Sequence, residues 1–405
     1  MPRILLANEL GGGLGHVVRM GQVAAALRRH GATVHIAARR WSLAVLPPGE
    51  RHAAIPAPGL ARSTRGDLNA FNYAELLARV GYSDGAALAE HVAAWRRVVE
   101  DADPHLVVSD FAPGALLAAR ILGLPAATVG TGFALPPRQT PLPSFRPWMT
   151  PPLDRMAMHE REVLAAVNAV MESAGAANIG TLADLLHTGR DVLCTFAEFD
   201  HYGEHRNQAH QGDLAVGPIF GEAAEDPGGA EALGGGILAY LSPDSPALEC
   251  LAGAAEGIGL PILAIAPGLS DAEAKARSRT GITVRATTLP LAAVLAASRA
   301  VVCHGGMGLV SRALLAGRPL VMVPRNPEQL GTAHRVVAAG YGLILAEHDA
   351  GIAMAATVRR AVDQPTLTAA AGAFAERHRG YDPATTADTV AGTLVDYARN
   401  FGGTR

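Results

Sequence analysis

Apolar residues recur along the chain with two different periods. Residues 3–8, "RILLAN", form a short apolar run of the length of a buried strand. Apolar side chains then follow at the 3.6-residue period of a helix, at Val17, Met20, Val23, Ala24 and Leu27. Gly31 follows as a helix stop, and "TVHIAAR" at 33–39 has the pattern of a second strand. The order predicts a βαβ unit of about 30 residues.

The same alternation continues through the chain. In the first half, strands are predicted at 105–110, 125–130 and 191–196, and long helical patterns at 67–100 and 156–186. In the second half, six apolar runs alternate with helical patterns, at 237–242, 261–267, 282–286, 300–306, 319–326 and 342–345. Strands and helices in strict alternation predict parallel, doubly wound α/β sheets.

A change in composition divides the chain. Residues 217–236, "GPIFGEAAEDPGGAEALGGG", are rich in Gly, Ala, Pro and acidic residues, as linkers are. We therefore expect a domain over 1–216, the linker 217–236 and a second domain over 237–380. The helical pattern at 381–405 is expected to pack back on the first domain. Two tandem Rossmann-like domains would then face each other across a cleft.

Composition narrows the class of protein. A chain of 405 residues with 49% hydrophobic and 18% charged residues fits two well-packed domains. A net charge of −3 gives no basic surface for nucleic acid, and no apolar run is long enough to cross a membrane. The three cysteines form no close pair, which favours a reducing compartment, and the cytoplasm is the expected location. Nothing in the composition indicates an oligomeric state.

A glycine-rich turn with a histidine follows the first strand. In "GGGLGH", Gly11, Gly13 and His16 occupy the three glycine places of the dinucleotide fingerprint, so the third glycine is missing. The second strand ends in Arg39 and Arg40 rather than an acid, which leaves NADP as one alternative. A turn that only packs helix on strand is another, but it gives no reason for the histidine.

A histidine at this place can act as a base. The start of a helix favours the neutral imidazole over the charged one. Asp110 ends the strand at 105–110, and carboxyl ends of parallel strands meet at one edge, so Asp110 can orient His16. The alternative for Asp110 is the N-cap of a helix that begins near Pro113.

The most informative stretch is 303–336, "CHGGMGLVSRALLAGRPLVMVPRNPEQLGTAHRV". After a strand, His304, Gly305 and Gly306 lead into a helix that starts with Met307 and Gly308, an arrangement that suits a phosphate group. Glu328 and Gln329 follow the next strand and suit a ligand rich in hydroxyl groups. The alternative is an ordinary strand–helix turn.

With these motifs in hand, the sequence resembles the nucleotide-sugar-dependent glycosyltransferases of the GT-B fold, of the UDP-glycosyltransferase and bacterial natural-product type. The resemblance covers nearly the whole chain. It rests on "GxGH" at 13–16, on "HGG" at 304–306, on "PRNPEQ" at 324–329 and on "VGPIF" at 216–220.

The resemblance implies an inverting hexosyl transfer without a metal ion or a cofactor; the nucleotide sugar is a co-substrate. His16 would be the catalytic base and Asp110 its partner. The donor would contact the second domain, at Ser242, His304, Gly305, Gly306, Met307, Gly308, Glu328 and Gln329. A small-molecule acceptor would lie against the first domain, with Gly13, Gly15, Phe133, Phe145 and Trp148 as candidate contacts; for the aromatic residues, packing in the core is the alternative.

Three positions depart from that family pattern. Arg312 stands where many UDP-using members have a ribose-binding glutamate, so a dTDP-sugar is as admissible as a UDP-sugar. Only Ser242 keeps a hydroxyl in the loop "YLSPDSP", where the family has a Gly-Ser loop, and Thr332 replaces a common asparagine. A nucleotide-sugar-binding or partner protein that has lost catalysis, or a nucleotide-sugar epimerase, therefore remains as an alternative.

Two metal-like motifs are discounted. "HYGEH" at 201–205 has the H-x-x-E-H spacing of a zinc site, but Gly203 opposes the regular helix that this site needs. "DAD" at 101–103 lies at the amino end of the strand at 105–110, away from the edge where ligands bind.

Overall fold

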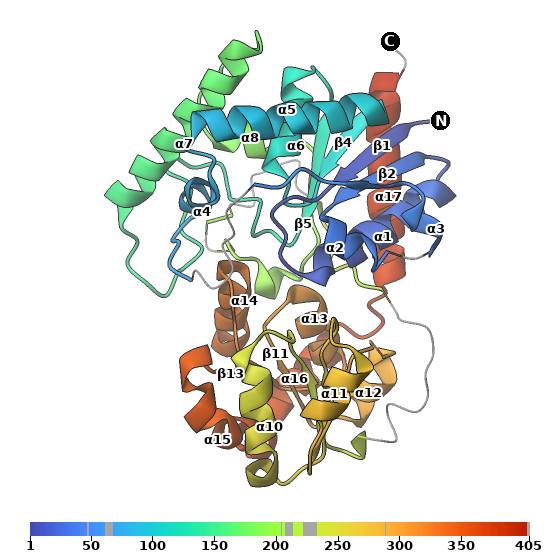
Figure 1. The fold of residues 1–405 in the computed structure, drawn as a ribbon, viewed down its shortest axis with the longest axis vertical. Coiled ribbons are helices and arrows are strands. Elements are labelled where there is room, and N and C mark those ends of the chain that lie inside the picture. Colours follow the sequence, from blue (N-terminus) through green and yellow to red (C-terminus); the bar gives the residue numbers. More distant parts are fainter. Residues whose placement is uncertain are drawn as a thin grey trace. The chain divides into compact units, whose positions relative to one another are not determined.

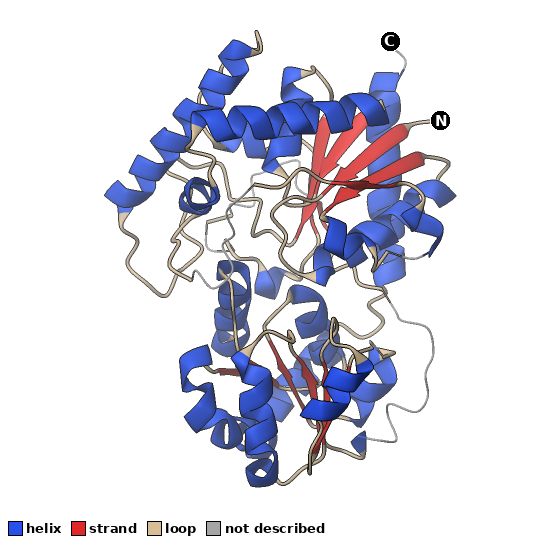
Figure 2. Cartoon of the chain, in the orientation of Figure 1, coloured by secondary structure: helices blue, strands red, loops and turns tan. Residues whose placement is uncertain are grey.

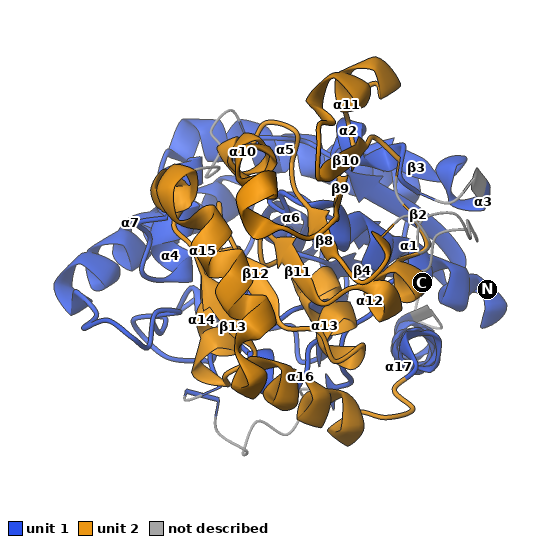
Figure 3. Ribbon diagram, turned by 90° about the horizontal axis from the view of Figure 1, so that it is seen from below, with its two compact units in different colours: residues 1–221, 382–405 blue, residues 222–381 orange. Residues whose placement is uncertain are grey.

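The structure is a computed structural model that describes residues 1–46, 48–60, 68–203, 205–206, 214–221, 233–287 and 289–402. The chain forms two compact units, shown in two colours in Figure 3: unit 1 is Met1–Gly221 with Asp382–Arg405, and unit 2 is Glu222–Tyr381. Each unit has a sheet with helices packed on it (Figure 2). Most of the predicted linker at 217–236 lies outside the described residues.

Unit 1 contains a seven-stranded parallel sheet in the order β3-β2-β1-β4-β5-β6-β7. The strands are β1 (Arg3–Ala7), β2 (Thr33–Ala38), β3 (Ala54–Pro56), β4 (Leu106–Ser109), β5 (Ala126–Gly130), β6 (Asp191–Leu193) and β7 (Leu214–Ala215). The central strands are buried, as a parallel sheet covered on both faces requires. The predicted parallel α/β class is confirmed.

The helices of unit 1 are α1 (Leu14–Arg29), α2 (Arg40–Leu43), α3 (Pro48–Arg51), α4 (Tyr73–Val80), α5 (Gly85–Ala102), α6 (Pro113–Ile121), α7 (Leu153–Ser173), α8 (Ala183–Leu186), the 3₁₀ turn η1 (Ala197–Phe199) and α17 (Pro383–Gly402). Both long predicted helices are wrong in extent. Gly81, at φ 111°, ends α4 before Asp84 caps α5, and Gly175, at φ 72°, follows the end of α7.

Helices cover both faces of the unit 1 sheet (Figure 1). On one face, α1 and α17 pack side by side, and Leu27 and Leu394 belong to the same buried cluster as Ile4 and Ile36. On the other face, Trp95 of α5 and Ala115 of α6 pack on the alternate side chains of the strands. The α17 segment therefore completes a core that is otherwise built from the first half of the chain.

Unit 2 contains a six-stranded parallel sheet in the order β10-β9-β8-β11-β12-β13. Its strands are β8 (Ile237–Tyr240), β9 (Ile262–Ile265), β10 (Ile282–Arg285), β11 (Ala300–Cys303), β12 (Leu320–Met322) and β13 (Gly342–Ile344). Its helices are α10 (Pro246–Ile258), α11 (Asp271–Arg277), α12 (Leu291–Ala297), α13 (Met307–Leu315), α14 (Pro327–Ala338), α15 (Ala350–Asp363), α16 (Pro365–Arg377) and the 3₁₀ turn η2 (Glu347–Asp349). Apolar side chains of α10 and α15 pack together on one sheet face.

Each sheet has one point where the strand order reverses. In unit 1 it lies between β1 and β4, and in unit 2 between β8 and β11. Connections leave in opposite directions there, so the carboxyl ends of the two strands border a crevice in which α/β proteins bind ligands. No helix in the described part of the chain is long and apolar enough to cross a membrane.

Candidate active site

The switch point of unit 1 carries His16. Strand β1 ends at Ala7, and α1 begins at Leu14 without a side-chain cap at Gly13. His16 is the third residue of α1 and is only 8% exposed. The imidazole therefore lies at the positive end of a helix dipole, which favours its neutral form.

Asp110 lies on the neighbouring strand end and contacts the histidine. Ala7 and Ser109 are register partners in β1 and β4, so Asp110 follows directly at the same sheet edge. His16 Nδ1 and Asp110 Oδ1 are 2.8 Å apart, and Asp110 is 3% exposed. The alternative that Asp110 caps a helix is wrong: the N-cap residue of α6 is Ala112, which makes no side-chain cap hydrogen bond, and the Gly114 N–H at that end donates to Glu9 instead.

Arg19 is the part of this cluster that the sequence interpretation missed. It lies one turn after His16, is 5% exposed, and donates from Nε to Asp110 Oδ2 at 2.9 Å and from Nη2 to Asp110 Oδ1 at 2.7 Å. Burial alone would raise the pKa of Asp110, but the positive charge of Arg19 and the His16 contact hold that pKa below its usual range. The sequence could have indicated Arg19 by its spacing: it follows His16 by three residues, which puts the His16 and Arg19 side chains on one face of the helix.

Of the four glycines in the turn, Gly11 is the one whose place leaves no room for a side chain. A Cβ atom on Gly11 would lie 2.5 Å from Asn8 Nδ2 and 2.5 Å from His16 Cδ2, so only glycine fits there. A Cβ on Gly12, Gly13 or Gly15 would meet no described atom within 4 Å. The histidine ring thus packs directly on Gly11.

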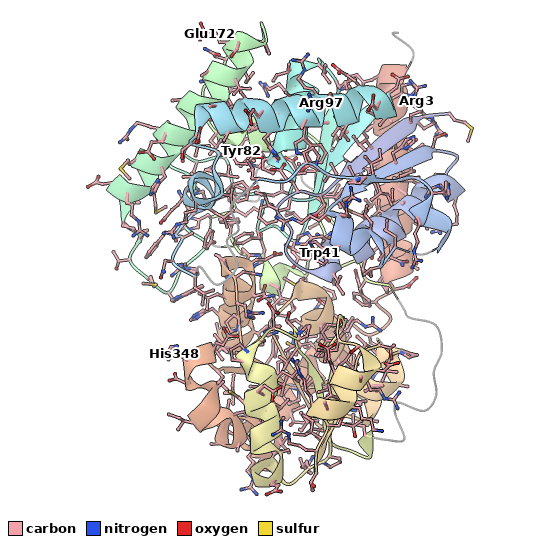
Figure 4. The ribbon with its side chains drawn as sticks, in the orientation of Figure 1. Arg3, Trp41, Tyr82, Arg97, Glu172 and His348 are labelled. Carbon is pink, nitrogen blue, oxygen red and sulfur yellow. The ribbon has the colours of Figure 1, made fainter. Side chains whose placement is uncertain are left out.

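Glu9 forms a second buried network behind the turn. Its carboxylate accepts hydrogen bonds from Tyr82 Oη at 2.5 Å, from His91 Nε2 at 2.8 Å and from the Gly114 N–H at 2.9 Å. Tyr82 is fully buried, and Figure 4 labels its place beneath α5. Three donors compensate a buried carboxylate, so Glu9 ties the end of β1 to α5 and α6.

The three aromatic acceptor candidates differ in their surroundings. Phe133 and Phe145 are 2% and 1% exposed, and their ring centroids lie 4.9 Å apart inside the apolar core of unit 1. Core packing therefore describes both residues. Trp148 lies in the proline-rich loop and is half-buried, so it is the one of the three with a part of its side chain exposed to solvent.

In unit 2, His304 spans the switch point. Its Nδ1 donates to the Val323 carbonyl oxygen at 2.8 Å, and its Nε2 accepts from the Ser242 N–H at 2.9 Å. This pattern needs the neutral ring, and burial lowers the pKa of His304 in agreement. Both ring nitrogens are therefore used inside the protein. The donor-side role expected of His304 stays a prediction.

The two motifs of the second domain are in contact. Gly305 adopts φ 89°, and a Cβ there would lie 3.0 Å from the Gln329 carbonyl oxygen, so the turn of "HGG" packs on the start of α14. Gly306 is the N-cap of α13, and Met307 and Gly308 are its first residues, with no side-chain cap in the described structure. The N-terminus of α13 therefore favours a bound anion, and it lies beside the start of α14.

Glu328 and Gln329 form the first turn of α14. Asn326 caps this helix by accepting from the Gln329 N–H at 2.9 Å, and Gln329 Oε1 accepts from the Arg325 N–H at 2.9 Å. The Gln329 side chain therefore holds its own loop. Both residues are half-buried at the carboxyl edge of the sheet.

Arg325 adds a cation at that edge. Its Nη1 donates to Asp244 Oδ1 at 3.0 Å, and its Nε lies 3.2 Å from Glu347 Oε1. Ser242 Oγ also donates to Asp244. Loops that follow β8, β12 and β13 are thus joined by one guanidinium group, which the sequence interpretation did not single out.

The two discounted motifs gather no metal-site geometry in the described residues. Asp103 ends α5 and pairs with Arg3 at 2.7 Å, at the amino end of the sheet. In "HYGEH", Glu204 lies outside the described residues, and His201 is 1% exposed. Among the described residues, no three metal-binding side chains gather in one place.

Comparison with known proteins supports the GT-B resemblance. Residues 269–395 match the family model "Erythromycin biosynthesis protein CIII-like, C-terminal domain". No curated protein sequence matches the chain. The predicted fold is confirmed, because glycosyltransferase structures align over the whole chain.

Three of these structures illustrate the match. The glycotransferase of kitacinnamycin aligns with a TM-score of 0.68 at 18% identity, over 98% of this chain and 99% of its own. The glycosyltransferase VinC in complex with dTDP aligns with a TM-score of 0.66 at 18% identity, over 98% and 100%. SsfS6 of Streptomyces sp. SF2575, complexed with thymidine diphosphate, aligns with a TM-score of 0.64 at 18% identity, over 98% and 100%.

Proposed function

We propose that this chain, with its GT-B fold and its match to the EryCIII-like C-terminal domain, is an inverting glycosyltransferase. It transfers a sugar from a nucleoside diphosphate sugar to a hydroxyl group of a small-molecule acceptor. The observation that carries the proposal is the buried His16–Asp110 contact of 2.8 Å at the switch point of the first sheet. A neutral imidazole held by a carboxylate is the arrangement of a general base.

The proposed reaction needs one proton transfer and one displacement. His16 takes the proton of the acceptor hydroxyl at Nε2, while Nδ1–H donates to Asp110. The acceptor oxygen attacks the anomeric carbon from the face opposite the diphosphate, which inverts that carbon. The bond between the anomeric carbon and the diphosphate oxygen breaks, and its electron pair leaves with the diphosphate. General-base help of this kind contributes roughly 10²–10⁴-fold in rate.

Unit 2 binds the donor in this proposal. The start of α13 at Gly306 and Met307 and the Arg325 guanidinium offset the diphosphate charge, so the mechanism includes no metal ion. Glu328 and Gln329 bind sugar hydroxyl groups. His304 braces the loop that carries Ser242 rather than contacting the phosphate.

The nucleotide is proposed to be dTDP or UDP. Arg312 on α13 supports dTDP, because a guanidinium group cannot accept hydrogen bonds from the two ribose hydroxyls of UDP. The structures in complex with dTDP among the similar proteins give further support. Neither Arg312 nor the dTDP complexes of similar proteins indicate which sugar is transferred or which acceptor receives it.

A second candidate is a nucleotide-sugar-binding protein without turnover. Asp244 favours it, because a carboxylate 3.0 Å from Arg325 competes with a diphosphate for the same cation. An epimerase is less well supported: it would need several carboxylates around the sugar, and Asp244 and Glu347 at this edge are paired with Arg325, which leaves Glu328 as the obvious candidate.

The decisive experiment combines binding and turnover. Thermal shift with dTDP, UDP, GDP and NADP tests the donor class; a nucleotide at about 100 times its Kd adds about 2.7 kcal/mol of stability. Turnover of dTDP-glucose and UDP-glucose with a panel of phenolic and macrocyclic alcohols, with and without EDTA, tests transfer. NMR of the product gives the anomeric configuration.

The variants separate the candidates. His16→Ala should keep dTDP binding and lose turnover by at least about 10²-fold, while His348→Ala, at an exposed residue of unit 2 (Figure 4), should change neither. Stabilisation by NADP alone, or full turnover by His16→Ala, contradicts the proposal. Binding of dTDP without turnover of any tested acceptor by the unmodified protein supports the second candidate.

A further inference from the structure

Arg19 forms a closed triangle with the two proposed catalytic groups. Arg19 Nη2 lies 2.7 Å from Asp110 Oδ1 and 3.1 Å from His16 Nδ1, and His16 Nδ1 lies 2.8 Å from the same Asp110 oxygen. Each of the three side chains is less than a tenth exposed. Solvent therefore screens these charges little.

The triangle changes what Asp110 does to the histidine. A lone buried carboxylate beside an imidazole stabilises the protonated ring strongly. Here the Asp110 charge is already paired by a bidentate guanidinium group. The added proton on His16 would also lie close to the fixed positive charge of Arg19. Both effects oppose protonation of the ring.

Three further groups near the cluster have partners or protonation states that the described part of the chain gives. Cys194, which follows β6, interacts electrostatically with Arg19 and Asp110, and burial raises its pKa to about 12, so the thiol stays neutral. Phe111 contributes only a ring, 6.0 Å from the His16 ring centroid. Glu9, on the turn before α1, directs its carboxylate to Tyr82 and His91. Among the described contacts, Arg19 and Asp110 are the charged groups that lie against the His16 ring.

We propose that Arg19 is a positioning residue of the base site, which keeps His16 neutral near pH 7 while Asp110 holds its Nδ1–H. The inference rests on the proposed base role of His16. Arg19 touches no substrate in this scheme; it acts through Asp110 and through its charge.

The triangle also sets which ring nitrogen carries the proton. Nδ1 cannot donate to Asp110 and accept from Arg19 with the same tautomer. If Nε2 is to act as the base, the ring proton must be on Nδ1, where it is donated to Asp110. The Nδ1 contact to Asp110 is the shorter of its two contacts. Arg19 Nη2 carries two hydrogens and donates one of them to Asp110 Oδ1. The 2.8 Å contact between His16 Nδ1 and Asp110 Oδ1, against 3.1 Å between His16 Nδ1 and Arg19 Nη2, favours the proton on Nδ1.

The test is an NMR titration of His16 in the full-length protein without substrate. Nitrogen-15 shifts of the ring report the tautomer and the pH at which the ring is protonated, independently of any turnover. In Arg19→Met, His16 should be protonated at a pH about 1 unit or more higher than in the unmodified protein, because an unpaired Asp110 now acts on it. In Asp110→Asn the midpoint should fall below that of the unmodified protein.

The matched control is Arg29→Met on the same helix. Arg29 is 58% exposed and pairs with Asp388 on α17, so its removal should leave the His16 midpoint unchanged. Arg19→Lys, which keeps the charge, should restore most of the unmodified midpoint. A purely structural role for Arg19 predicts no such ordering.

Where Arg19→Met folds, two outcomes overturn the inference. One is an unchanged His16 midpoint in that variant; the other is a His16 ring with its proton on Nε2 in the unmodified protein. If Arg19→Met does not fold, Arg19→Met with Asp110→Asn removes both charges, and its midpoint should lie above that of Asp110→Asn alone. Equal midpoints there also overturn the inference. If the midpoints are as expected but the unmodified protein turns over no tested donor and acceptor, the inference stands and the proposed function is contradicted instead.

Discussion

The Ser242 backbone N–H donates to His304 Nε2 at 2.9 Å, which joins the loop after β8 to the end of β11 across the switch point of unit 2. The other ring nitrogen of His304 donates to the Val323 carbonyl beyond β12. One neutral imidazole thus holds three neighbouring loops.

His304→Ala should therefore loosen the donor edge without removing a ligand contact. The variant leaves the Ser242 N–H and the Val323 carbonyl without their ring partner, which costs about 1–3 kcal/mol. We expect a lower urea midpoint for the unit 2 transition and weaker dTDP binding by calorimetry. His348→Ala, whose side chain is 83% exposed, is the control and should behave as the unmodified protein. Unchanged stability of His304→Ala contradicts the bracing role.

Acid should act on the same residue. Burial lowers the pKa of His304 below its ordinary value of 6.5, so the unfolded chain binds this proton more readily than the folded chain. The contribution of His304 to stability is complete above pH 6.5 and is lost as the pH falls toward the lowered folded pKa. Urea midpoints measured between about pH 7 and 5 should fall less in His304→Ala than in the unmodified protein. Parallel curves for the two proteins would contradict the assignment.

Gly11→Ala should displace the proposed base. Its new methyl group would lie 2.5 Å from the His16 ring, and overpacking of this kind costs typically 1–3 kcal/mol. The expected result is a lower melting temperature together with a changed His16 ring shift in NMR spectra. Gly12→Ala is the matched control, because its Cβ meets no described atom within 4 Å; its stability should change by less than about 0.5 kcal/mol. A Gly11→Ala protein as stable as Gly12→Ala would contradict the close packing.

Arg325→Ala should weaken donor binding through charge. Removing the guanidinium group takes a positive charge away from Asp244 and Glu347 at the edge proposed to bind the diphosphate. A lost charge-assisted hydrogen bond of about 1.5–3 kcal/mol corresponds to roughly tenfold or greater loss of dTDP affinity. Calorimetry measures it, with Arg360→Ala on the outer face of α15 as the control.

Asp244→Asn in the Arg325→Ala background distinguishes repulsion from a lost contact. If the freed carboxylate repels the diphosphate, the second change restores part of the affinity. If Arg325 acts only by direct contact, the affinity stays at the level of Arg325→Ala. Unchanged affinity in Arg325→Ala itself would remove Arg325 from the proposed donor site.

Strand ends were the most predictable part of the site. His16 and Asp110 are far apart in sequence, yet parallel strands bring all carboxyl ends to one edge, so their approach followed from two apolar runs and one rule. The contact between the Gly305 turn and α14 followed from the same rule. The catalytic role of these residues stays a prediction.

Side-chain partners were less predictable, since they depend on rotations that no periodicity encodes. Arg19 resembles an ordinary helix cation until Asp110 is known to face that side of α1. Glu9 resembles a polar residue of a turn, although it accepts three buried hydrogen bonds. The helix pattern at 67–100 continued through Gly81 because one left-handed glycine leaves the apolar spacing on either side unchanged.

The packing of α17 on α1 has a consequence for synthesis on the ribosome. Ile4 and Leu394 belong to the same core of unit 1. Residues 222–381, which form unit 2, lie between them in the sequence and leave the ribosome before Leu394 does. Unit 1 cannot bury the face of α1 that packs on α17 until the ribosome has synthesised α17. Unit 2, whose segment is continuous, can reach its final core first. This chain is therefore one in which the domain translated second is the first that can finish folding, and in which the exposed α1 is a surface for chaperones to cover in the meantime.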